Sequence, residues 1–217
     1  IKKQVIKEIS KWSKKNSIIA SSSSGLLPTI IQKSCKFPER FLIAHPFNPV
    51  YLLPLVEIVK GKKTKKIFID NSKKFYESLG MYPLILKKEV EGYLSDRLQE
   101  SMWRESLHIL NDNLATTEDL DKAIIYGPGM RWALMGTFLT FHLAGGKEGM
   151  KHMLEQFGPA LKLPWTKLKA PILTKKLSNK IINETKKQSK KKSIKQLTNL
   201  RDNFLVDLLK LKNKYKL

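Results

Sequence analysis

The stretch LIAHPFNPVYLLPLVEIVKG, residues 42–61, places His45 between apolar residues typical of a β-strand and a Pro-Phe-Asn-Pro turn. Glu57 follows twelve residues later, inside a second apolar run, LVEIV. Two ionisable side chains are costly in apolar surroundings unless they pair with each other or take part in chemistry. The stretch therefore predicts two strands, RFLIAH and LVEIV, and a paired or catalytic role for His45 and Glu57.

The segments on either side alternate between strand and helix patterns. NSIIA and YPLILKK predict two further short strands, and SSSSGLLP predicts a loop that leads into a helical turn. Helices are expected at residues 2–15 and 64–80. The apolar residues at helical spacing are Val5, Ile9 and Trp12 in the first helix, and Ile67, Phe68, Phe75 and Leu79 in the second, where they are expected to point inward. This alternation predicts the back half of an α/β sheet.

The pattern changes after Gly92, where apolar residues recur at steps of three and four residues. Thr116, followed by the acidic Glu118 and Asp119, is typical of a helix N-terminus. Helical segments are expected at residues 92–112, 116–127, 135–146 and 147–158, with a lysine-rich pair from Thr174 onward. We therefore expect an α/β domain over residues 1–91 and an all-helical domain over residues 92–217.

The composition is that of a globular protein with an unusual charge. Hydrophobic residues make up 41% of the chain, and no apolar run approaches the roughly 18 residues of a membrane span. The net charge is +22, yet residues 92–158 carry −3 and residues 167–217 carry +13. Lysine outnumbers arginine 36 to 5, whereas phosphate and base recognition tends to recruit arginine. We interpret the charge as compositional and expect neither a membrane nor a nucleic-acid partner.

The single cysteine, Cys35, excludes an internal disulfide, and no metal-ligand spacing surrounds it. Cys35 is therefore interpreted as a small residue of a protein in the reducing cytoplasm. No metal site is predicted.

Four short pieces occur in an order that resembles the 3-hydroxyacyl-CoA dehydrogenase superfamily: IIASSSSGL, HPFNP, LVEIV and EVEGYLSDRL. The resemblance covers nearly the whole chain. Later stretches, among them GYLSDRLQESMWRESLHIL and GMKHMLEQFGPALKLPWTKL, are similar to the branch of that family that oxidises L-carnitine to 3-dehydrocarnitine with NAD. The resemblance implies a Rossmann-type NAD-binding domain followed by an all-α domain like the C-terminal domain of 6-phosphogluconate dehydrogenase. That helical domain would form a homodimer.

The resemblance also implies roles for single residues. His45 matches the base that takes the hydroxyl proton, and Glu57 matches the carboxylate that orients its imidazole. Ser24 matches the serine that holds the substrate oxygen, although the same serine run also contains Ser22, near the cofactor, and Ser23. A helix cap is the simpler alternative for Ser24.

Asn48 matches the asparagine beside the substrate oxygen and the nicotinamide carboxamide, with turn formation as its alternative. Asp96 stands where the hydroxyacyl-CoA enzymes carry an asparagine. It is expected to contact substrate, unless it belongs to an ordinary charged helix surface with its neighbours Arg97 and Glu100.

A carnitine-like substrate carries a quaternary ammonium group at one end and a carboxylate at the other. Aromatic faces bind such cations, and guanidinium groups bind carboxylates. Arg131 is expected to clamp the carboxylate. The aromatic candidates are Phe47, Trp103, Trp132, Phe138 and Phe141, of which Phe47 and Trp132 are preferred.

The chain begins with Ile1 and contains no G-x-G-x-x-G turn of the kind that binds a dinucleotide pyrophosphate. We therefore expect an N-terminally truncated chain that binds NAD poorly by itself. Two alternatives to carnitine oxidation stay open: a 3-hydroxyacyl-CoA dehydrogenase of fatty-acid metabolism, and an inactive or assembly fragment with a polyanion-binding basic tail.

Overall fold

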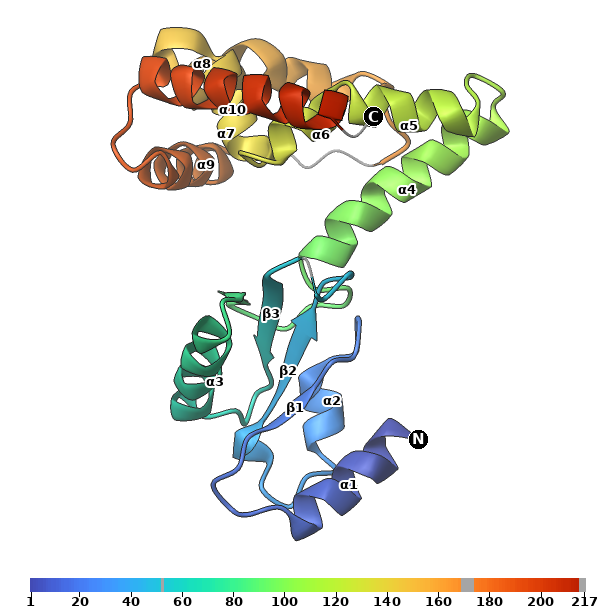
Figure 1. The fold of residues 1–217 in the computed structure, drawn as a ribbon, viewed down its shortest axis with the longest axis vertical. Helices are drawn as coiled ribbons and strands as arrows, with labels where there is room; N and C mark the ends of the chain where they lie inside the picture. Colours follow the sequence, from blue (N-terminus) through green and yellow to red (C-terminus); the bar gives the residue numbers. More distant parts are fainter. Residues whose placement is uncertain (52, 169–173, 215–217) are drawn as a thin grey trace. The chain divides into compact units, whose positions relative to one another are not determined.

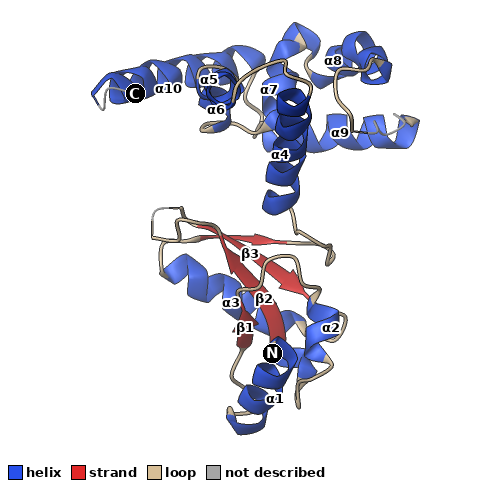
Figure 2. Ribbon diagram, turned by 90° about the vertical axis from the view of Figure 1, so that its right-hand side faces the viewer, coloured by secondary structure: helices blue, strands red, loops and turns tan. Residues whose placement is uncertain are grey.

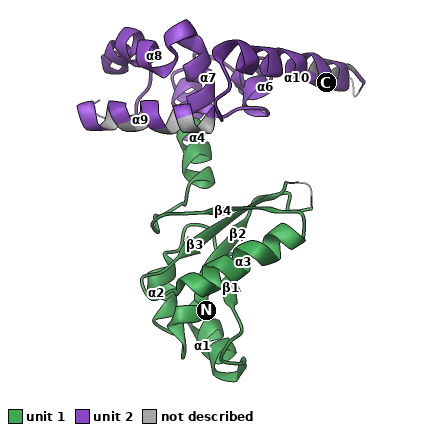
Figure 3. Cartoon of the chain, turned by 90° about the vertical axis from the view of Figure 1, so that its left-hand side faces the viewer, with its two compact units in different colours: residues 1–102 green, residues 103–217 purple. Residues whose placement is uncertain are grey.

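The computed structural model describes residues 1–51, 53–168 and 174–214 (Figure 1). The chain divides into two compact units, residues 1–102 and 103–217 (Figure 3). The domain boundary expected after residue 91 stays a prediction. Within the described ranges, no helix is both long enough and apolar enough to cross a membrane.

The first unit is an α/β unit built on a mixed sheet with the strand order β1-β2-β3-β4. Strand β1 is parallel to β2, β2 is antiparallel to β3, and β3 is parallel to β4. The elements are α1 (Lys2–Trp12), β1 (Ile19–Ser21), α2 (Pro28–Gln32), η1 (Pro38–Arg40), β2 (Phe41–Pro46), β3 (Leu55–Lys60), α3 (Lys66–Ser78), β4 (Tyr82–Ile85) and the first turns of α4 (Ser95–Asn111).

Alternating side chains of β2 and β3 enter two separate cores on the two faces of the sheet. Figure 2 shows α2 on one side of the sheet and α3 on the other. Phe41, Ile43 and Val59 pack with residues of α1 and α2. The neighbouring residues in each strand, such as Leu42 in β2 and Ile58 in β3, point to the opposite face and pack against α3. The alternation puts His45 and Glu57 on the same face as Phe41, Ile43 and Val59. The predicted α/β architecture is confirmed.

The inward face expected for α3 was wrong for three of its four residues, whereas Phe68 is half-buried. In α3, Ile67, Phe75 and Leu79 are 56%, 56% and 59% exposed, whereas Ile69 and Ser72 are buried. The small Ser72 lets the helix approach the sheet closely, and a pattern of large apolar residues cannot show this. In α1, the residues at the noted spacing are likewise exposed (Val5, Ile9 and Trp12), while Ile6 and Ser10 are buried.

A fully buried arginine ties the end of α1 to the sheet. The Arg40 guanidinium donates to the carbonyls of Ser10 and Ser17 at 3.0 Å, to the Ser13 hydroxyl at 2.8 Å, and to the Lys14 carbonyl. These acceptors lie at the C-terminal end of α1 and in the turn after it, where unpaired carbonyls carry partial negative charge. Backbone oxygens therefore compensate the buried cation.

The second unit is helical, as predicted. It contains most of α4, then α5 (Thr117–Ile125), α6 (Pro128–Trp132), α7 (Thr137–Ala144), η2 (Gly146–Glu148), α8 (Met150–Phe157), η3 (Gly158–Lys162), α9 (Lys175–Gln188) and α10 (Ile194–Lys214). A small core joins Met135, Leu143 and Leu197. The predicted helix start at Thr116 is confirmed, because Thr116 and Asp119 form a reciprocal capping box.

A half-buried histidine of α7 bonds to the start of α8. The His142 Nδ1 atom accepts a hydrogen bond from the Met150 backbone N–H at 3.0 Å. Burial lowers the pKa of His142 below its ordinary value. Gly149 has φ +61°, and a Cβ there would lie 2.3 Å from the His142 ring, so only glycine fits.

Candidate active site

His45 and Glu57 are directly opposite each other on the antiparallel strands β2 and β3. Cross-strand partners point to the same face of a sheet. The His45 Nδ1 atom therefore lies 3.1 Å from Glu57 Oε2, in a site where His45 is 6% exposed and Glu57 is fully buried. The two ionisable residues are paired.

The second oxygen of Glu57 receives three donors from the start of α4. The backbone N–H groups of Leu94 and Ser95 donate to Oε1 at 3.0 Å each, and the Ser95 hydroxyl donates at 3.3 Å. N–H groups at a helix start and the helix dipole both stabilise a carboxylate. An ionised Glu57 accepts hydrogen bonds only, so it requires a proton on His45 Nδ1 and leaves the Nε2 lone pair free to take a proton.

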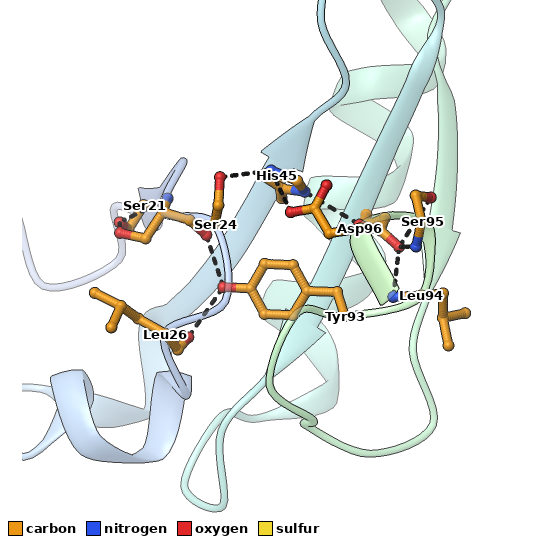
Figure 4. A network of polar contacts seen from close by, with 10 residues as sticks. Ser21, Ser24, Leu26, His45, Tyr93, Leu94, Ser95 and Asp96 are labelled. Atoms are coloured by element: carbon orange, nitrogen blue, oxygen red, sulfur yellow. Dashed lines mark hydrogen bonds and ion pairs between the residues drawn. The ribbon is translucent and has the colours of Figure 1, made fainter. Parts of the chain in front are cut away.

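The serine loop after β1 brings one hydroxyl to that lone pair. Ser24 Oγ lies 3.0 Å from His45 Nε2 (Figure 4). Ser23 is buried, and its hydroxyl contacts Ser21 Oγ at 2.7 Å and Lys2 Nζ at 2.5 Å. Ser22 is exposed. The loop therefore directs Ser24, rather than its neighbours, toward His45; the catalytic role of Ser24 stays a prediction.

Tyr93 is a site residue that the sequence patterns did not single out. Its hydroxyl lies 2.7 Å from the Ser23 carbonyl and 2.9 Å from the Leu26 carbonyl, and its ring centroid is 5.3 Å from that of His45. Burial raises the pKa of Tyr93, and the charges of Glu57 and Asp96 raise it further, so the phenol stays a neutral donor. Its place within EVEGYLSDRL was the available signal.

Asp96, in the first turn of α4, lies near the Nε2 atom of His45. Its Oδ2 atom is 3.8 Å from His45 Nε2, and its side chain is 35% exposed. This distance is too long for a hydrogen bond, so the carboxylate lies beside the base without bonding to it. Residues 93–96 thus contact the serine loop, Glu57 and His45 in succession.

The remaining predicted residues are less closely tied to this centre. Phe47 starts the turn after β2, where its N–H donates to the Leu55 carbonyl at 3.1 Å, and Asn48 is exposed in that turn. Arg131 and Trp132 end the short helix α6 of the second unit, and both are exposed. Binding of cofactor or substrate by these residues stays a prediction.

Chemically, Ser24, His45 and Glu57 form a continuous line of polar contacts that ends in a buried carboxylate. A hydroxyl bound at Ser24 can pass its proton to Nε2, and Glu57 stabilises the imidazolium that results. Across the described part of the chain, no group of three metal-ligating side chains is present. The arrangement suits proton abstraction from an alcohol.

Comparison with family models covers most of the chain. Residues 1–90 match "3-hydroxyacyl-CoA dehydrogenase, NAD binding domain", and residues 92–192 match "3-hydroxyacyl-CoA dehydrogenase, C-terminal domain". Both units therefore contain sequence of one enzyme family.

Among curated proteins, the chain is 57% identical over 215 residues to the L-carnitine dehydrogenase of Bacillus cereus, covering 99% of the chain and 66% of that protein. It is 54% identical to the L-carnitine dehydrogenase of Oceanobacillus iheyensis, covering 99% of the chain and 70% of that protein. The chain thus spans about two thirds of the length of these relatives.

Among solved structures, a 3-hydroxyacyl-CoA dehydrogenase from Archaeoglobus fulgidus matches with a TM-score of 0.70 and 20% identity, covering 98% of this chain and 72% of that one. This match shows the shared fold. An (S)-3-hydroxybutyryl-CoA dehydrogenase from Ralstonia eutropha matches with a TM-score of 0.56 and 27% identity, covering 71% of this chain and 52% of that one.

Proposed function

The chain belongs to the 3-hydroxyacyl-CoA dehydrogenase family, and on that premise we propose that its protein oxidises the secondary alcohol of a 3-hydroxy acid, with NAD as cofactor. We further propose that the substrate is L-carnitine and the product 3-dehydrocarnitine. The observation that carries the proposal is the line of contacts from Ser24 through His45 to Glu57, at 3.0 and 3.1 Å.

In the proposed reaction, Ser24 donates a hydrogen bond to the substrate oxygen and holds it beside His45 Nε2. His45 takes the hydroxyl proton, and Glu57 stabilises the resulting imidazolium through Nδ1–H. General-base catalysis of this kind contributes a rate factor of roughly 10²–10⁴. NAD, when bound, supplies the acceptor for the hydride that leaves the carbinol carbon.

The residues in the loops after β1 and β2 fit the nicotinamide end of that cofactor. Ser22 and Asn48 are exposed in these loops, which follow two parallel neighbouring strands. Carboxyl ends of such strands are where α/β sheets bind nucleotides. A hydroxyl and an amide supply the donors and acceptors that a carboxamide requires.

The similarity to L-carnitine dehydrogenases favours carnitine over an acyl-CoA substrate. Asp96 favours it as well, because a carboxylate beside the base suits a cationic substrate better than an anionic one. For the carnitine carboxylate we propose Arg131, and for its ammonium group Phe47 and Trp132.

We also propose that the protein is a cytoplasmic homodimer joined through its helical unit. The described helices of that unit leave large apolar side chains exposed, including Trp103, Phe138 and Phe141. Such surfaces mark interaction sites. Light scattering that returns a monomer at high protein concentration would contradict this assembly.

The test of function is an NADH-absorbance assay of the full-length protein that carries this chain. L-carnitine and 3-hydroxybutyryl-CoA are compared as substrates at matched concentrations. We expect a higher kcat/KM for L-carnitine. Higher activity with the acyl-CoA would replace the carnitine assignment, and no activity with either substrate would contradict the proposed function itself.

A further inference from the structure

We infer that Asp96 determines substrate charge: it selects 3-hydroxy acids that carry a cation on the carbon next to the carbinol. This inference rests on the proposed function and deepens it. The aromatic candidates Phe47 and Trp132 would contact the quaternary ammonium group through the faces of their rings. Asp96 supplies the negative charge that the site requires.

The position of Asp96 carries the inference. Its Oδ2 atom lies 3.8 Å from His45 Nε2, the atom that receives the substrate proton. A hydroxyl oxygen bonded to Nε2 at about 2.9 Å therefore lies within about 7 Å of that carboxylate. Substituents on the carbinol carbon lie within about 3 Å of that oxygen, two bonds away.

The first unit does not provide Asp96 with a cation other than the site histidine. Within residues 1–51 and 53–102, no lysine or arginine nitrogen forms an ion pair with Asp96. Its side chain keeps 35% of its surface exposed. A partly exposed carboxylate at a reacting centre attracts a positive group from the substrate.

The chemistry explains why such a charge is tolerated there. Proton removal leaves negative charge developing on the substrate oxygen, and a neighbouring carboxylate opposes it. A cation on the adjacent carbon offsets that repulsion, because one intervening carbon puts the cationic nitrogen about 2.5 Å from the carbinol carbon. A neutral alcohol receives no such compensation, so Asp96 discriminates in the transition state as well as on binding.

The test compares L-carnitine with its carbon isostere, in which a quaternary carbon replaces the nitrogen, so that the cation is lost and the carboxylate is kept. Both are assayed with the full-length protein and with the Asp96→Asn and Asp96→Glu variants. We expect the wild type to prefer L-carnitine, and Asp96→Asn to reduce the ratio of the two kcat/KM values by about tenfold or more. Asp96→Glu, which keeps the charge, should retain most of the ratio.

Glu77→Gln is the matched control, because Glu77 is an exposed carboxylate of α3 paired with Lys73, away from the site. It should leave the ratio unchanged. If Asp96→Asn does not fold by circular dichroism, Asp96→Ser provides the same comparison.

The outcomes separate this inference from the proposed function. A wild type that turns over both substrates, with an equal ratio in Asp96→Asn, overturns the role of Asp96 and leaves the dehydrogenase function intact. A wild type without preference for L-carnitine overturns it too. A wild type that oxidises neither substrate overturns the proposed function, and the inference with it.

Discussion

Glu57 lies opposite His45 in the β2–β3 register, with its Oε2 atom 3.1 Å from Nδ1 and its Oε1 atom bonded to the start of α4. One carboxylate therefore serves two purposes. It sets the imidazole tautomer, and it fixes the helix start to the sheet beside the base.

Glu57→Gln should reduce turnover in the full-length protein by roughly a thousandfold. The glutamine carbonyl can still accept from the α4 N–H groups, so the fold is kept. The glutamine amide then donates to Nδ1, which places the imidazole proton on Nε2 and removes the base. Steady-state kinetics measure the loss, and circular dichroism checks the fold; near-normal kcat in a folded variant would refute the pairing.

Tyr93→Phe should reduce kcat by about tenfold, because the loop that carries Ser24 loses its anchor at the Ser23 carbonyl. Kinetics of the full-length protein check this. In a Ser24→Ala background, Tyr93→Phe should reduce kcat by a smaller factor, since both changes act through the contact between Ser24 and His45. Tyr82→Phe is the matched control, because Tyr82 is 66% exposed in the same unit. Full additivity of the two changes would argue against the anchor.

Arg40→Met should lower the free energy of unfolding of the first unit by about 3 kcal/mol. Methionine fills the space, but it leaves the carbonyls of Ser10 and Ser17 without the guanidinium donor, whereas the Lys14 carbonyl keeps the Ser17 N–H. Urea denaturation of the chain measures the change. Lys74→Met, at an exposed position of α3, should have little effect. Equal stability of the two variants would contradict the account of Arg40.

The stability of the second unit should fall as the pH drops below about 6.5, the ordinary histidine pKa. Burial holds the pKa of folded His142 below that value, so the unfolded chain binds the proton more readily. Stability from this group is therefore present above pH 6.5 and is lost as the pH falls through the folded pKa.

His142→Asn checks this pH dependence, because the asparagine oxygen can accept from the Met150 N–H but does not titrate. Urea midpoints at pH 7.5 and 5.5, each about one unit from the ordinary histidine pKa, should differ less in this variant than in the wild type. His152→Asn, at an exposed position, should keep the wild-type difference. An unchanged difference in His142→Asn would assign the pH dependence to another group.

Much of the fold was predictable because its signals are local. The apolar runs around His45 and Glu57 define two strands, and Thr116 and Asp119 define a helix start within four residues. The separation of twelve residues between His45 in HPFNP and Glu57 in LVEIV also indicates that the two side chains pair.

Other features depend on contacts between distant segments, which local patterns do not carry. Tyr93 reaches a carbonyl 70 positions away, and the backbone donors of Glu57 come from residues 37 and 38 positions away. The buried face of α3 escaped prediction because Ser72 is small and polar. Its burial depends on the sheet beneath it.

The central claim is that Glu57 holds His45 with its proton on Nδ1 and its lone pair on Nε2. Nitrogen NMR of the ¹⁵N-histidine-labelled chain tests it directly, with the His45 signals assigned by their loss in His45→Gln. We predict a neutral imidazole protonated on Nδ1 in the wild type and on Nε2 in Glu57→Gln. The same tautomer in both proteins would contradict the account.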